Sequence, residues 1–136
     1  MPNVIMSYSI NPVEEEQCVL LTYEGEMAAM EVVAVRSEAA RLLSARHWNR
    51  MVVDISALRS LSALEMFVFA RGLPSELPRY VSVALIVRPE QAVYATFIEK
   101  VAENDGVFIA FFFHMEDAIA WVNPLGATVY DQEMAS

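Results

Sequence analysis

The apolar and polar residues along the chain follow two alternating periods, that of strands and that of helices. Short apolar or alternating runs bounded by Pro, Gly, Asn or Asp are typical of strands. They fall at residues 4–10, 17–23, 50–55, 81–87 and 107–113. Apolar residues three and four positions apart are typical of helices. They fall at residues 28–46, 62–72, 88–103 and 116–122, so the predicted order is β-β-α-β-α-β-α-β-α.

Residues that interrupt regular structure mark the ends of these elements. Pro12 cannot donate a backbone hydrogen bond, so we expect it to end the first strand. We expect Gly25 to break the second strand, which is close enough to the first to pair with it as a hairpin. Ser62 and Glu65 have the spacing of a capping box that opens the second helix, and Gly72 closes that helix.

The connections between strands predict the fold class. Each of the last three strands is reached through a helix, which requires parallel strands and right-handed crossovers. The predicted fold is therefore α/β, a mostly parallel sheet of about five strands with an antiparallel N-terminal edge hairpin, covered by four helices. We expect one domain over residues 1–124 and a loose C-terminal tail over residues 125–136.

Composition narrows the classes of partner. Hydrophobic residues make up 56% of the 136 residues and the net charge is -9, so the chain should fold, and its surface should repel nucleic acid and anionic lipid. Lys100 is the only lysine, and no basic cluster exists. No apolar run approaches the roughly 18 residues of a membrane span, so we expect no stable membrane association. The first residues lack a charged start and an apolar signal core, and we expect a cytoplasmic protein.

The residue types that carry chemistry are sparse. Cys18 is the only cysteine and lies in a predicted strand, where we expect an inert buried thiol. His47 follows the first long helix and His114 precedes the last one, without metal-ligand spacing, and structural roles at those helix ends are favoured. We therefore predict no catalytic group, no metal and no cofactor.

Asp54 is the most suggestive polar residue. It lies near the end of a predicted parallel strand, on the side of an α/β sheet where ligands bind. The favoured interpretation is structural, with the carboxylate accepting loop N–H groups. A small site formed with Ser56 and Ser60 is the alternative. Ser62 is predicted to be a helix N-cap, and phosphorylation of Ser62 or Ser60 is its alternative.

A group of large apolar residues predicts a surface that binds a ligand or a partner. Phe67 and Phe69 are two positions apart on a predicted helix and cannot both face one core. A ligand pocket, a dimer surface or a helix buried on nearly all sides would each account for the group. Its members are Met27, Met30, Met66, Phe67 and Phe69.

Three local stretches, together with the order of elements, resemble STAS domains, and in particular stage II sporulation protein AA-like proteins. Residues 21–27 (LTYEGEM) are similar to the family's strand and the Gly-Glu-apolar sequence before its first long helix. Residues 50–58 (RMVVDISAL) are similar to its central strand, which ends in Asp or Asn. Residues 115–121 (MEDAIAW) are similar to its closing helix. The resemblance spans residues 3–122 and implies a regulatory module without catalysis.

The chain departs from the phospho-regulated members of that family at the modified serine. Those members carry Asp-Ser-Ser/Thr-Gly at the start of the second helix, where a kinase modifies the first hydroxyl residue. Counting from Asp54, the family's Asp falls on Ser62 and its serine on Ala63, followed by Leu64 and Glu65. Ala63 therefore stands where the family has the serine that is phosphorylated. The CRAL-TRIO lipid-binding domain, a similar fold, encloses an apolar ligand.

Two functional hypotheses follow. The first is a non-enzymatic STAS-like module that binds a protein partner, a second copy of itself or a small apolar ligand. The second is a small enzyme or phospho-switch at the strand ends near Asp54, Ser56, Ser60 and Ser62. The first is favoured because no nucleophile, base and orienting group can be assembled from the residues. We also expect a homodimer formed through apolar surface, either on the second helix or at the N-terminal sheet edge.

Overall fold

The computed structural model describes residues 7–26, 29–60, 71–72, 81–103 and 107–123. In this part of the chain a five-stranded sheet has its strands side by side in the order of the sequence. The first pair is antiparallel and the other three are parallel, as predicted. The strands are β1 (Ser7–Val13), β2 (Cys18–Glu26), β3 (Arg50–Ser60), β4 (Ser82–Ile86) and β5 (Phe108–Phe112).

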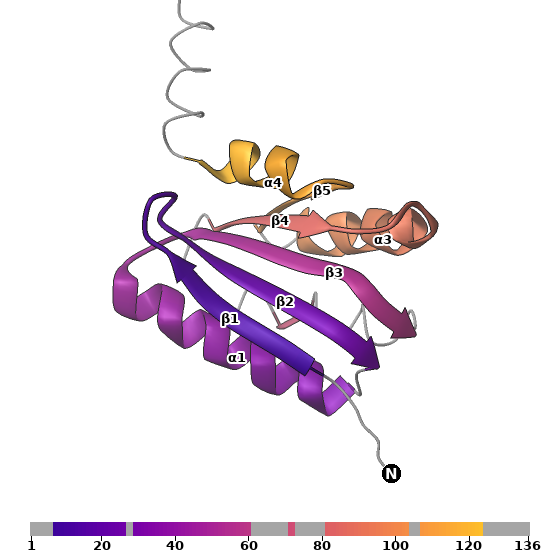
Figure 1. Ribbon diagram of the computed structural model, residues 1–136, viewed down its shortest axis with the longest axis horizontal. Helices are drawn as coiled ribbons and strands as arrows, with labels where there is room; N and C mark the ends of the chain where they lie inside the picture. Colours follow the sequence, from indigo (N-terminus) through magenta and orange to yellow (C-terminus); the bar gives the residue numbers. More distant parts are fainter. Residues whose placement is uncertain (1–6, 27–28, 61–70, 73–80, 104–106, 124–136) are drawn as a thin grey trace, which may run out of the picture.

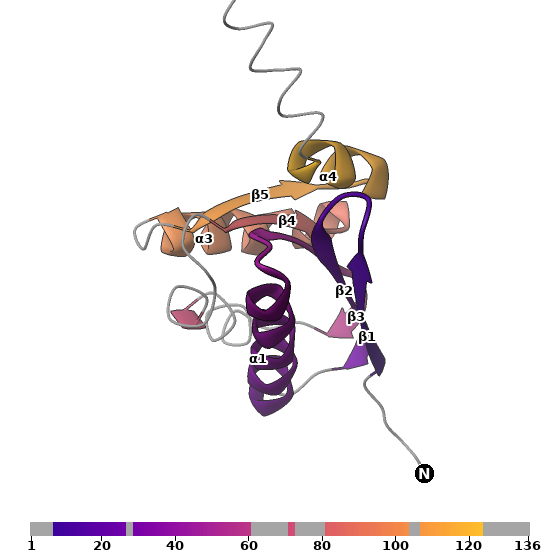
Figure 2. The ribbon, with the colours of Figure 1, turned by 90° about the vertical axis from the view of Figure 1, so that its left-hand side faces the viewer.

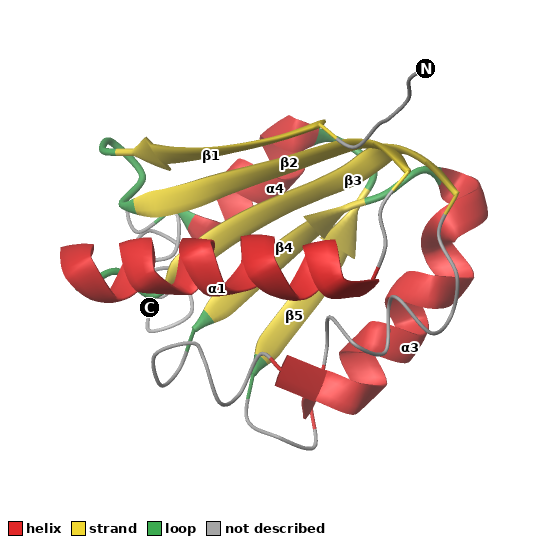
Figure 3. Ribbon diagram, turned by 90° about the horizontal axis from the view of Figure 1, so that it is seen from below, coloured by secondary structure: helices red, strands yellow, loops and turns green. Residues whose placement is uncertain are grey.

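Helices cover both faces of this sheet. Helices α1 (Ala29–Arg46) and α3 (Ala92–Glu103) pack on one face, and α4 (Met115–Val122) packs on the other. Figure 3 shows α1 and α3 in front of the strands and α4 behind them, and Figure 2 shows the layers edge-on. A short 3₁₀ helix, η1 (Pro89–Gln91), precedes α3. The described residues contain these three α-helices; the predicted helix over residues 62–72 lies outside them except for Arg71 and Gly72.

The core follows from the alternation of side chains along the central strands. On β3, Met51 and Val53 face α1 and α3, while Val52 faces α4. Strand β4 is buried on both faces, which accounts for its continuous apolar run. No helix in the described part of the chain is both long and apolar enough to span a membrane.

The predicted end of the first strand is wrong. Pro12 lies within β1 and is paired with Val19 of β2. Strand β1 is at the edge of the sheet, so it has a partner on one side only. A residue without an N–H group is tolerated on such a strand, because the missing donor can fall on the open side.

The predicted ends of β2 and β3 are also wrong, because these two strands pair with each other over more residues than predicted. Gly25 does not break β2; it pairs with Leu58 and has a φ of 82°. A positive φ is easily reached by glycine, which lets the strand continue through an irregular register. Strand β3 likewise continues past Ile55 to Ser60.

The predicted apolar stripe of α1 is confirmed, with one unexpected member. Val32, Val35 and Leu43 are buried against the sheet. Arg36 lies on the same face and is also buried, although an arginine there would be expected to face solvent. The helix ends at Arg46, and His47 follows in the left-handed region with a φ of 59°.

Candidate functional site

The carboxyl ends of β2 and β3 extend beyond the rest of the sheet. Pairing between β3 and β4 stops at Asp54 and Ile86, whereas pairing between β3 and β2 continues to Ser60 and Glu26. Residues 23–26 and 55–60 therefore form a two-stranded extension, here called the projecting ribbon. Figure 1 shows both strands running past the tip of β4.

Asp54 lies at the base of the projecting ribbon, beside a bulge. Thr22 pairs with Asp54 and Glu24 pairs with Ala57, so β3 has one more residue than β2 in this interval. The extra residue displaces the backbone of Ser56 from the regular ladder. Asp54 Oδ1 accepts hydrogen bonds from the Ser56 N–H at 2.9 Å and from Ser56 Oγ at 2.6 Å. The carboxylate thus compensates for the bulge.

Two side chains, one just before η1 and one at its end, hold the side of the ribbon that β4 leaves open. Arg88 Nη1 donates to the carbonyl oxygen of Ser56 and, at 2.8 Å, to that of Leu58. Gln91, which is buried, donates through Nε2 to the carbonyl oxygen of Ile55 at 3.0 Å. No described strand supplies hydrogen-bond donors to these three main-chain carbonyl groups on this side. Two side chains supply them instead.

Local contacts orient both of these side chains. Gln91 Oε1 accepts from the Arg88 N–H at 2.8 Å, and Glu90 accepts from Arg88 Nε at 3.0 Å. The pKa of Glu90 is lowered, first by a hydrogen bond from its own backbone N–H and then by Arg88. The sequence pattern predicted Arg88 only as the start of a helix. Its role depends on β3 extending beyond β4, which no local pattern in the sequence indicates.

The outer side chains of the projecting ribbon face solvent. Glu24 and Glu26 on β2 are exposed, as are Ala57 and Arg59 on β3. The ribbon therefore presents two acids, one base and a small residue on a framework held by Arg88 and Gln91. These four positions were not among the predicted site residues, because the strands were predicted to end before them.

The structure brings together only some of the predicted site residues. Asp54 and Ser56 are in contact, and Ser60 lies at the tip of the same strand. Met30 is in α1. Met27, Ser62, Met66, Phe67 and Phe69 lie outside the described residues, together with Ala63, Leu64 and Glu65.

The remaining candidate residues occupy separate places. Cys18 is fully buried, and burial, followed by the charge of Glu16, raises the pKa of its thiol to about 11. His47 precedes β3, at the opposite end of that strand from Asp54. His114 is at the N-cap position of α4, but its side chain makes no capping hydrogen bond there. No cluster of three or more potential metal ligands occurs in the described residues.

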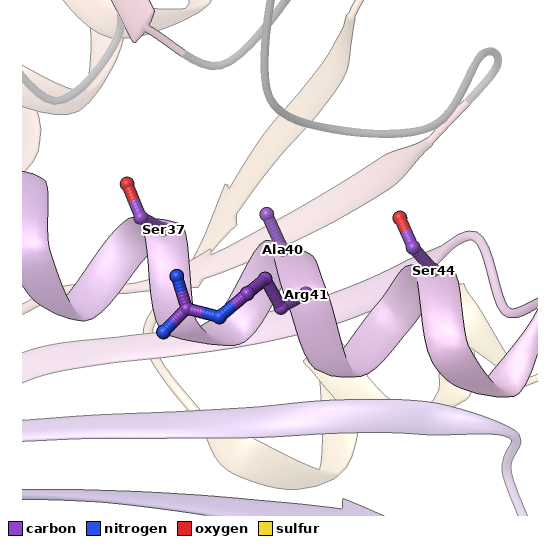
Figure 4. A pocket seen from close by; sticks show the side chains of 4 residues that line it. All are labelled: Ser37, Ala40, Arg41 and Ser44. Carbon is purple, nitrogen blue, oxygen red and sulfur yellow. The ribbon is translucent and has the colours of Figure 1, made fainter.

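A shallow groove follows one side of α1. It is lined by Ser37, Ala40, Arg41 and Ser44, which recur along the helix at intervals of three and four (Figure 4). Two hydroxyl groups and a guanidinium contribute polar atoms to this lining.

A second polar arrangement is buried beneath α1. Tyr23 and Arg36 are buried, and the pKa of the Tyr23 phenol is raised by burial, against an opposing effect of Arg36. Among the described residues the Tyr23 hydroxyl has no hydrogen-bond partner. Gly72 lies directly against the Arg36 guanidinium, which would overlap a Cβ atom at that position.

The fold is similar to those of two solved proteins. An anti-sigma factor antagonist from Mycobacterium paratuberculosis matches with a TM-score of 0.62 and 15% identity, over 87% of this chain and 94% of that one. A protein of the DUF3478 family with a SpoIIAA-like fold, from Shewanella loihica PV-4, matches with a TM-score of 0.60 and 17% identity, over 90% of this chain and 98% of that one. No family model and no curated protein matches the sequence. The predicted SpoIIAA-like, or STAS-like, fold is confirmed.

Proposed function

We propose that this SpoIIAA-like chain is a regulatory module that binds a protein partner through the projecting ribbon and catalyses no reaction itself. The similarity to an anti-sigma factor antagonist supports a regulatory role of this kind. In the ribbon, three exposed charged side chains, Glu24, Glu26 and Arg59, lie on a backbone held by Arg88 and Gln91.

The observation that carries the proposal is the use of Arg88 as a support for main chain. Its guanidinium donates to two carbonyl groups of β3 on the side where β4 no longer pairs with that strand. Hydrogen bonds from a charged donor are about twice as strong as neutral ones. They hold Ala57 and Arg59 at defined positions before any partner arrives, which reduces the entropy cost of binding.

An enzyme at the same place fits the geometry less well. Asp54 accepts both the N–H and the O–H of Ser56, the local contact that stabilises a backbone irregularity. A serine nucleophile needs a base that is oriented by a third group and a nearby donor for the developing oxyanion. The nearby donors Arg88 and Gln91 are directed at main-chain carbonyl groups instead.

An apolar small molecule is also less well supported. Such ligands bind in enclosed apolar cavities. The groove along α1 is open and carries Ser37, Arg41 and Ser44.

Site-specific photo-crosslinking in cells tests the proposal. A photo-reactive amino acid in place of Arg59 should capture one defined protein. The matched control is the same group at Glu15, which is exposed in the turn at the opposite end of β2. The captured protein, purified and titrated by calorimetry, should bind wild type and lose about tenfold or more in affinity for Arg59→Glu, since a reversed charge faces the same partner.

Three results would contradict the proposal. The first is equal capture at both positions, and the second is no effect of Arg59→Glu on affinity. The third is a small molecule retained in native mass spectrometry of protein purified from cells. Phosphate found on Ser60 or Ser62 after incubation with a kinase would favour the phospho-switch instead.

A further inference from the structure

Strand β5 is an edge strand of the sheet. It pairs with β4, and no other described strand lies beside it. Residues 107–113 (VFIAFFF) contain no charge and no proline. Exposed edges of this composition pair readily with further strands, and natural proteins usually interrupt them with charges, prolines or a covering element.

The opposite edge differs from β5 in this respect. Strand β1 contains Pro12, which cannot donate to a further strand. Its exposed Tyr8 donates to Glu38 of α1 at 3.4 Å. Of the two edges, β5 is therefore the one whose sequence permits pairing with another chain.

The register with β4 indicates which backbone groups of β5 face outward. Phe108 donates its N–H to the carbonyl of Val81, and the carbonyl of Phe112 accepts from Val87. Phe108 and Phe112 thus direct their main-chain groups toward β4. In a parallel strand alternate residues face opposite sides, so Ile109 and Phe111 direct theirs away from the sheet.

One outward group of β5 has a polar side chain of the protein itself beside it. Burial raises the pKa of the Glu99 carboxyl on α3, and its proximity to the backbone N–H of Phe111 acts in the opposite direction. The Glu99 carboxyl is therefore a polar group beside the outward N–H at the centre of an otherwise uncharged edge. A strand that pairs with β5 has to displace it.

We propose that β5 is a self-association edge, on which β5 of a second copy pairs antiparallel about a two-fold axis near Phe111, and that Glu99 restrains this pairing. The outward main-chain groups of Ile109 then pair with those of Phe113 on the other chain, and those of Phe111 pair with their own copy. The surface is self-complementary, as a two-fold interface requires.

A second copy fits this edge because its own β5 brings no charge to it. The aromatic side chains on both faces of the strand extend the contact. Phe111 and Phe113 form an edge-to-face pair with ring centres 6.0 Å apart, and Phe112 lies 5.8 Å from Trp121 of α4. Phe108, Phe113 and Trp121 are exposed, so burying them in a dimer removes apolar surface from water.

Sedimentation equilibrium measures this association. We use the full chain at about 150 mM salt, where repulsion between separate chains is screened beyond about 8 Å. Wild type should rise from 15.3 kDa toward twice that mass between about 1 and 100 µM, in the range of a small, reversible interface. Glu99→Ala should form the dimer about tenfold more tightly, and Phe113→Lys should weaken it by at least about tenfold, because each lysine then places a charge opposite Ile109 of the other chain, in an otherwise uncharged interface.

Two control variants separate the edge from general effects. Glu15→Ala removes an exposed acid from the turn between β1 and β2 and should leave the dimer constant within about twofold. Tyr8→Lys places the new charge on the opposite edge and should behave as wild type. Circular dichroism shows whether each variant is folded before it is compared.

The proposal is overturned if wild type and Glu99→Ala both remain at 15.3 kDa over this range. It is also overturned if Tyr8→Lys, rather than Phe113→Lys, abolishes the dimer. These results are independent of the proposed partner site, since the projecting ribbon and β5 are tested by different variants. Loss of crosslinking at Arg59 with an intact dimer would refute only the proposed function.

Discussion

Arg88 Nη1 lies 2.8 Å from the carbonyl oxygen of Leu58, a residue 30 positions earlier in the chain. The same nitrogen also donates to Ser56. One side chain from the start of η1 thus takes the place that a neighbouring strand would occupy beside β3. The projecting ribbon therefore depends on Arg88, which supplies the donors that a neighbouring strand would otherwise provide.

Replacing Arg88 with methionine should destabilise the domain. The variant keeps an apolar stem but leaves the carbonyl groups of Ser56 and Leu58 without their charged donor, at a cost of about 2 to 3 kcal/mol. Urea unfolding followed by circular dichroism measures it. The control is Glu90→Gln, which removes the charge of an exposed partner of Arg88 but leaves both carbonyl contacts in place, and its effect should be clearly smaller. Equal effects of the two variants would show that the carbonyl contacts contribute nothing.

Asp54→Asn should leave the fold intact and lower its stability by about 1 to 3 kcal/mol. The amide oxygen still accepts one hydrogen bond from Ser56, but the charge that strengthens both contacts is lost. Ser56→Ala removes only the hydroxyl donor and should cost less. Thermal melting compares the three proteins, and an unchanged melting temperature for Asp54→Asn would mean that its carboxylate has no structural role.

Gly72→Ala should destabilise the domain by up to about 1 kcal/mol, because the new methyl group overlaps the Arg36 guanidinium, the end of a flexible side chain that has to shift. A double-mutant cycle with Arg36→Ala isolates this contact. In the Arg36→Ala background the same Gly72→Ala change should be neutral or stabilising. If Gly72→Ala costs the same in both backgrounds, its effect arises elsewhere.

Cys18 should react slowly with thiol reagents in the native protein. Its pKa is raised from 9.0 to about 11, mainly by burial, which lowers the thiolate fraction at pH 8 about hundredfold. Burial also blocks access, so labelling should be more than a hundredfold slower than in urea. The same shift means that ionisation of Cys18 opposes folding as the pH rises through about 9 to 11. Labelling at the unfolded rate would contradict the burial of Cys18.

The order of elements was predictable because apolar periodicity is set by burial, and burial is strong here. The continuous apolar run of β4 and the stripe of Val32, Val35 and Leu43 on α1 both correspond to buried faces. Strand ends were less predictable. Pro12 and Gly25 ordinarily interrupt strands, but an edge position and a positive φ accommodate them.

The candidate site was predicted only in part. Asp54 and its neighbour Ser56 could be identified because a carboxylate near a strand end is visible in the sequence. The roles of Arg88 and Gln91 depend on contacts with residues more than 30 positions away, beside a strand longer than its neighbour. Local patterns carry no information about such a difference in strand length.

The order of strands in the sheet has a consequence for synthesis on the ribosome. The five strands lie side by side in the order in which they are translated, so each new strand can pair with the edge left by the one before it. No described strand must insert between two that have already paired. Strand β5 is made last of the five, so its uncharged edge emerges only after the other four strands have been synthesised.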